Sequence, residues 1–175
     1  MLIWIVVIVI ALVALILIYG ATQPAGFSVV READFKAAPK KVFAQINDFH
    51  NWQAWSPWEK MDPNMQRSFS GAAAGVGAKY AWVGNKKVGE GSMEITDSDG
   101  PRRMQLDLHF VKPFQADNVT EFTLTPQDKG THVKWEMRGR APFMFRVTGM
   151  FFSMDKIVGT DFERGLANLR GVVDK

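Results

Sequence analysis

The residues able to carry out acid–base or metal chemistry are few and widely spaced in this chain. It has three histidines, His50, His109 and His132, and none has a partner at the spacing of a metal site. Glu90 and Glu94 are four residues apart in a predicted strand, about 13 Å at 3.3 Å per residue, too far for a carboxylate pair. The chain has no cysteine, which excludes disulfides and thiolate metal sites. We therefore expect no catalytic residue, no metal and no cofactor.

Nucleotide and nucleic-acid binding are also disfavoured by the pattern of residues. The glycine pairs Gly75/Gly77 and Gly89/Gly91 do not lie between a strand and a helix, as a nucleotide motif requires. The net charge of +3 and the isoelectric point near 9.2 are mild, and no run of Lys and Arg resembles a nucleic-acid footprint. We expect no nucleic acid among the partners.

Alternating apolar and polar residues predict a largely antiparallel sheet after residue 26. In one stretch Leu106, Leu108 and Phe110 share a face, and in another Val133 and Trp135 do, with polar residues between them. One face of the sheet is therefore expected to be buried and the other to meet water. The predicted strands span residues 27–35, 66–70, 78–83, 88–96, 103–110, 118–125 and 131–138.

Helical spacing is predicted in two places. Residues 39–47 form a short helix with a proline in its first turn. Apolar residues recur every three or four positions over residues 143–173, which predicts one long amphipathic helix facing the sheet. Between the first strand and the second, Trp52, Trp55 and Trp58 form a compact aromatic segment that prolines keep from being a regular helix.

The order of these elements, together with five short stretches, resembles a known family. The stretches are FKAAPKKVF at 35–43, WQAWSPW at 52–58, GVG at 75–77, GEG at 89–91 and VGTDFERGLANL at 158–169. They resemble the START-like, Bet v 1-like superfamily, and within it the polyketide cyclase/dehydrase and lipid-transport (SRPBCC) family. The resemblance covers residues 27–175. It implies an α+β helix-grip fold, in which a curved antiparallel sheet wraps around a long C-terminal helix.

Members of that family include ligand-binding cups and cyclases, so the resemblance implies a pocket between sheet and helix. Inward side chains would form its wall, although the same residues are also consistent with a solid core. For the three tryptophans, an aromatic corner closing one end of the barrel is favoured over a gate. Among polar residues only Tyr80, Asn118 and Thr120 are expected inside, a sparse set for catalysis. The candidate cavity-lining residues are Trp55, Trp58, Tyr80, Trp82, Met93, Leu106, Leu108, Phe110, Phe122, Trp135, Met137, Met150 and Met154.

The first thirty residues carry no charged side chain, and residues 1–21 are almost purely apolar. This predicts a transmembrane helix with Trp4 and Tyr19 near its ends, a linker over residues 22–26 and one domain over residues 27–175. A cleaved signal fits less well, because no basic residue precedes the apolar run and the run is long. Arg31 and Lys36, with further lysines beyond them, favour a cytoplasmic domain in a single-pass protein of the cell membrane.

Three functions are compatible with these features. The leading hypothesis is a non-enzymatic, membrane-anchored module that binds a hydrophobic small molecule or lipid between sheet and C-terminal helix. The alternative is an enzyme of the polyketide cyclase/dehydrase type, which requires polar side chains converging in the cavity. An interaction adaptor would instead expose a large apolar patch.

Overall fold

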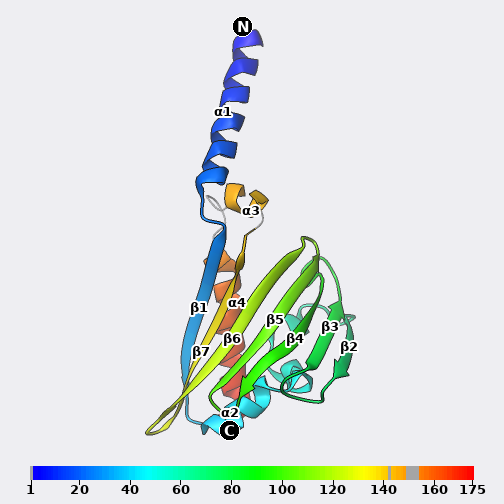
Figure 1. The fold of residues 1–175 in the computed structure, drawn as a ribbon, viewed down its shortest axis with the longest axis vertical. Helices are drawn as coiled ribbons and strands as arrows, with labels where there is room; N and C mark the ends of the chain where they lie inside the picture. Colours follow the sequence, from blue (N-terminus) through cyan, green and yellow to red (C-terminus); the bar gives the residue numbers. More distant parts are fainter. Residues whose placement is uncertain (1, 142, 149–153) are drawn as a thin grey trace.

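The computed structural model of the chain describes residues 2–141, 143–148 and 154–175. Within these residues, α1 (Leu2–Thr22) projects from one end of a domain in which a curved sheet lies against a helix (Figure 1). The apolar helix and the linker predicted from the sequence differ from the structure by one residue at each junction. α1 still includes Thr22, and the first strand already starts at Gly26.

The described strands form a single seven-stranded sheet in the order β1-β7-β6-β5-β4-β3-β2, with antiparallel neighbours throughout. β7 therefore joins β1 to the meander of the other strands, and the predicted helix-grip sheet is confirmed. The strands are β1 (Gly26–Phe35), β2 (Gln66–Gly71), β3 (Ala78–Val83), β4 (Glu90–Asp99), β5 (Arg103–Lys112), β6 (Ala116–Gln127) and β7 (Gly130–Arg140).

The sheet bends at β4, where the pairing with β5 shifts register between Glu90 and Gly91 and again between Ile95 and Asp97. Such irregularities increase local twist and re-aim the strand. Gly91 is required at the first shift, because a Cβ there would lie 2.4 Å from the carbonyl oxygen of His109. The bend turns the inner faces of β3 and β4 toward those of β6 and β7.

Alternation of burial follows the predicted pattern. In β7, Val133, Trp135 and Met137 are buried, while the residues between them are more exposed. β6 alternates in the same way, with Phe122 and Leu124 on the inner face. One face of the sheet thus meets water and the other forms the core, as an antiparallel sheet of this kind allows.

The inner face is covered by α4 (Met154–Val173), which packs along β1 (Figure 1). Phe162, Leu166 and Leu169 are buried on its sheet-facing side. Gly165 allows the close approach, because a Cβ there would lie 2.8 Å from Cζ3 of Trp135. Arg31 of β1 forms ion pairs with Asp155 in the first turn of the helix, at 2.8 Å, and with Glu163 near its middle, at 2.6 Å.

Short helical segments close the end of the sheet far from α1. They are α2 (Pro39–Ile46) and the 3-10 helices η1 (Phe49–Ala54) and η2 (Pro57–Lys60). The indole N–H of Trp52 donates to the carbonyl of Ile46 at 2.9 Å, and that of Trp55 donates to Gln45 at 3.1 Å. These bonds fix the aromatic segment as a packed corner, the reading that the sequence favoured.

The single helix predicted over residues 143–173 is wrong in its first part. The structure has a separate helix, α3 (Phe143–Thr148), which packs beside the end of α1 and not on the sheet (Figure 1). A Cβ on Gly20 would lie 2.4 Å from Cγ2 of Val147, so the two helices touch where the glycine leaves room. Helical spacing of apolar residues does not say which surface they meet, and here the surface is another helix.

Candidate functional site

A cavity of about 330 Å³ lies between α4 and the inner face of the sheet. Its position follows from the placement of α4. The helix is held close to β1 and Trp135, and inner side chains of β3, β4 and β5 line the space beside it. The volume is near the lower end of the range of roughly 300–1,000 Å³ for small-molecule sites.

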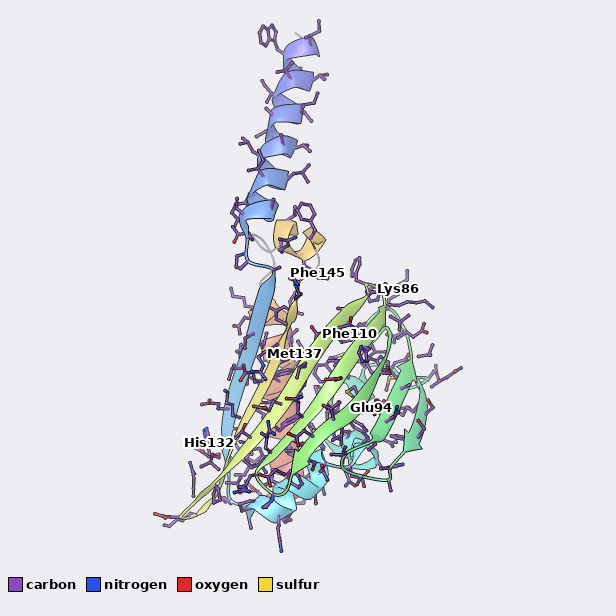
Figure 2. All side chains as sticks on the ribbon, in the orientation of Figure 1. Lys86, Glu94, Phe110, His132, Met137 and Phe145 are labelled. Carbon is purple, nitrogen blue, oxygen red and sulfur yellow. The ribbon has the colours of Figure 1, made fainter. Side chains whose placement is uncertain are left out.

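Most of the candidate lining residues named from the sequence lie in the wall of this cavity. Trp82 and Phe110 form part of it with ring centroids 5.8 Å apart, and Trp135 lies beside α4. In Figure 2, Phe110 and Met137 are labelled on β5 and β7. The candidates in the wall are Trp58, Tyr80, Trp82, Met93, Leu106, Leu108, Phe110, Trp135 and Met137.

Two candidates, Trp55 and Phe122, lie in the solid core instead. Both are 0% exposed, and their rings meet edge to face at 6.2 Å. The carbonyl of Trp55 also accepts a hydrogen bond at 3.0 Å from Asn168 of α4, which ties the aromatic corner to the helix. For these residues the prediction of a cavity wall is wrong, because they fill the space where helix, corner and sheet converge.

The described residues that line the cavity do not include the two methionine candidates, Met150 and Met154. Met150 lies outside the described residues, and Met154 begins α4. The wall from this part of the chain comes instead from Ile157, Val158 and Phe162. The ring of Phe162 stacks on that of Trp135 at 3.9 Å.

A buried polar cluster that the sequence did not reveal lies in the same wall. Glu59, at the end of the aromatic corner, accepts hydrogen bonds from the Tyr80 hydroxyl at 2.6 Å and from Nε of Arg67 at 2.6 Å. Burial, followed by the hydrogen bond to Glu59, raises the pKa of Tyr80 above its usual range. The hydrogen bond to Glu59 likewise raises the pKa of Arg67. Glu59 stands in a proline-bounded segment without periodicity, so no sequence pattern marks it as inward.

The hydrogen bonds of the cluster join three structural elements. Each carboxylate oxygen of Glu59 has a donor, one from Arg67 and one from Tyr80, and Arg67 also donates to the backbone carbonyls of Met65 and Glu59. The cluster therefore braces η2 against β2 and β3.

Two other polar atoms at the cavity are without partners. Among the described residues, neither Oδ1 of Asn118 nor Nε1 of Trp135 has a hydrogen-bond partner, and both atoms are buried. Both residues line the cavity, as does Thr120 between them. Buried polar groups without partners cost free energy, so these two atoms lower the stability of the folded chain. Asn118 and Thr120 match the inward polar residues expected from the sequence.

Asp161 of α4 is the remaining acidic group in the wall. Burial raises the pKa of its carboxyl above 3.8, and Arg164, at 3.3 Å, opposes the shift. It is a second acidic residue that faces the cavity from outside the strands, where the alternation rule gives no signal.

The histidines and paired glutamates lie away from the cavity. His109 contacts Asp117 at 2.7 Å and His132 contacts Asp34 at 2.7 Å, both on the wet face. Glu90 and Glu94 pair across strands with lysines at 2.7 Å and 3.0 Å. Within the described part of the chain no group of three potential ligands is placed to hold a metal ion.

Comparison with known proteins gives the family. Residues 26–174 match the family model described as polyketide cyclase/dehydrase and lipid transport. The chain belongs to this family. No curated protein matches it closely enough to suggest a more specific function.

Solved structures of several other proteins share the fold at low identity. A protein of Chromobacterium violaceum has a TM-score of 0.62 at 15% identity, covering 85% of this chain and 97% of that one. A protein of Mesorhizobium loti has a TM-score of 0.62 at 20% identity, covering 85% and 97%. An Aha1 dimer from Colwellia psychrerythraea has a TM-score of 0.60 at 14% identity, covering 85% and 96%. At such identities these similarities establish the fold alone.

Proposed function

We propose that this chain is a single-pass membrane protein whose domain binds an apolar small molecule or lipid between the sheet and α4. The cavity carries the proposal: aromatic, aliphatic and methionine side chains line a space of about 330 Å³. Thioethers such as those of Met93 and Met137 adapt to ligands of varied shape. The volume favours a single chain or a ring system over a molecule with two long acyl chains.

The anchor is supported by α1. Its 21 residues rise about 31 Å, close to the roughly 30 Å hydrocarbon core of a bilayer. Among the residues of α1 whose exposure is described, Gly20 alone is buried, and the side chains of the others are mostly exposed. A signal sequence would also give an apolar N-terminal helix, but the contact between Gly20 and Val147 gives α1 a place in the folded protein. The basic residues after the helix favour a cytoplasmic domain.

An enzyme of the cyclase/dehydrase type is the second candidate. The family description supports it, as does the Tyr80 hydroxyl in the cavity wall. Both carboxylate oxygens of Glu59 are engaged by Arg67 and Tyr80, which favours a structural role for that residue. We therefore place binding first.

The test starts from the full chain, extracted from membranes in polymer-bounded lipid discs so that no detergent enters the cavity. Mass spectrometry of bound molecules, compared with a Leu108→Phe variant in which the cavity is partly filled, identifies the ligand. A molecule enriched with the native chain and depleted in the variant supports binding. Equal recovery from both, or none from either, contradicts it.

The same preparation separates carrier from enzyme. The purified ligand is incubated with the native chain and with a Tyr80→Phe variant, which keeps the ring and removes the hydroxyl. Ligand recovered unchanged from both supports a carrier. Conversion by the native chain that the variant lacks supports the enzyme.

A further inference from the structure

We propose that the rim of the cavity is a docking surface for an anionic lipid bilayer, so that the cavity opens toward the membrane. The rim comprises residues 84–89, residues 111–115 and α3 together with Arg140. This inference rests on the proposed anchoring by α1 and adds a second contact with the same membrane.

Strand register places the rim at the end of the sheet where α1 departs. Gly26, which follows the linker, pairs with Arg140, and Gly139 pairs with Asn118 near the start of β6. At the same end of the strands, Lys112 pairs with Glu90, and Glu90 pairs with Val83. The β3–β4 connection and the β5–β6 connection therefore lie at this end of the sheet. Figure 2 labels Lys86 and Phe145 there, and His132 toward the opposite end.

A continuous series of contacts links the membrane helix to the rim. Val147 of α3 packs on Gly20, near the Tyr19 end of α1. Phe145, two residues before Val147 in α3, meets Phe114 edge to face with ring centroids 5.2 Å apart. Both phenylalanines also line the cavity. The residues at the mouth are thus held at the level where α1 leaves the lipid.

The rim is apolar where it faces outward. Phe114 is 52% exposed and Val111 is 47% exposed, although both are large apolar side chains. Val111 lies near the end of β5, and Phe114 lies in the loop that follows it. Phe143 of α3 is also exposed. Aromatic and aliphatic side chains of this kind favour the interface between water and lipid.

Positive charge surrounds these apolar side chains. Lys86, Lys87 and Arg140 are exposed, and Lys87 and Arg140 also line the mouth. Of the acidic groups nearby, Glu90 pairs with Lys112 at 2.7 Å, Asp117 contacts His109 at 2.7 Å, and Asp62 accepts a hydrogen bond from the backbone N–H of Asn85 at 2.6 Å. Apolar side chains flanked by lysines fit an anionic bilayer surface better than they fit a protein partner, because the tether already holds a lipid surface beside them.

The experiment uses the absence of cysteine to place one environment-sensitive label on the full chain. Gln115→Cys puts the label beside Phe114, and Lys129→Cys puts it in the β6–β7 turn, about 33 Å away along ten residues of β7. Both variants are reconstituted into nanodiscs of phosphatidylcholine and phosphatidylglycerol containing a lipid with a spin-label quencher. We expect quenching at position 115 at least threefold greater than at position 129. Equal quenching at the two positions overturns the proposal.

Two substitutions test which side chains make the contact. Phe114→Asp in the position-115 background should reduce quenching at least twofold, whereas Val76→Asp, which alters an exposed apolar residue at the other end of the sheet, should not. Lys86→Glu combined with Lys87→Glu should also reduce it. Quenching unchanged by both rim substitutions overturns the proposal.

Failure of docking and failure of anchoring give different results. Co-flotation of the chain with lipid vesicles reports insertion of α1, and the label reports the position of the rim. A chain that floats with vesicles while its rim label stays unquenched contradicts docking alone. A chain that does not float contradicts the anchoring on which docking depends.

Discussion

A pair of identical substitutions tests the central feature of the structure, the unfilled space beside α4. Leu108 and Leu124 both face inward, but Leu108 lines the cavity and Leu124, 2% exposed, lies outside it in the core. Leu124→Phe adds atoms to a packed interior, which costs about 1–3 kcal/mol. At roughly 2–4 °C per kcal/mol for a chain of this size, the unfolding temperature should fall by about 2–12 °C. Leu108→Phe extends into open space and should lower it by less than about 2 °C.

The assay is thermal unfolding of the full chain in lipid nanodiscs, followed by tryptophan fluorescence. Detergent is avoided because a detergent tail would itself occupy an apolar cavity and stabilise the folded state by mass action. Displacement of a fluorescent apolar dye measures the space directly, and Leu108→Phe should weaken dye binding while Leu124→Phe leaves it unchanged. Equal losses of stability in the two variants, with equal dye binding, would refute the reasoning, since the gap would then be solid.

Three further predictions concern the surroundings of the cavity. Glu59→Gln should lower the free energy of unfolding by about 1–3 kcal/mol in urea titrations, because the partly buried guanidinium of Arg67 loses its counter-charge. Gly171→Ala should raise thermal stability by about 1 kcal/mol, because nothing lies within 4 Å of the new methyl group, whereas Gly165→Ala should lower it by about 1–3 kcal/mol through the clash with Trp135. For Asp161→Asn, the free energy of unfolding at pH 7 minus that at pH 3 should be larger than the same difference in the native chain.

The sign of the Asp161 prediction follows from the direction of its pKa. Burial raises the folded-state pKa above 3.8, so the folded chain binds the proton more tightly than the unfolded chain does. The contribution to stability is present at low pH and is lost as the pH rises through the folded-state pKa. Asparagine does not titrate, so the variant does not lose stability at this position as the pH rises. If Asp161→Asn has the same dependence of stability on pH as the native chain, the placement of Asp161 is contradicted. If Glu59→Gln leaves the free energy of unfolding unchanged, the ion pair between Glu59 and Arg67 is contradicted as a source of stability.

The inward strand residues could be predicted from the sequence because alternation has a period of two and one face is buried. Alternation predicts that Met93, Leu108 and Trp135 face inward, and in the structure their side chains lie on the inner face of the sheet and line the cavity. The same rule could not separate wall from core. Phe122 and Trp135 face the same way on adjacent strands, and only the position of α4 and the aromatic corner decides which one meets empty space.

The polar residues show where sequence reasoning stops. Glu59 and Asp161 both face the cavity, but one lies in a 3-10 helix and the other on a glycine-rich helix that sits to one side of the sheet. Neither position follows from a periodic pattern. α3 is a similar case: its apolar residues continue the spacing of the later helix, yet its partner is α1, a contact made possible by Gly20.

The role of α1 can be argued from what the fold does without it. The family model begins at residue 26, after the helix and its linker, and the neighbour from Chromobacterium violaceum is covered over 97% of its length by 85% of this chain. Sheet, aromatic corner and α4 thus form a complete fold that requires no N-terminal helix. A helix that adds no core to the domain, but contacts it through Val147 beside the mouth of the cavity, affects where the domain lies and how it faces. Since that mouth is also where the exposed phenylalanine and lysines gather, the proposed anchor and the proposed ligand site lie at the same end of the domain.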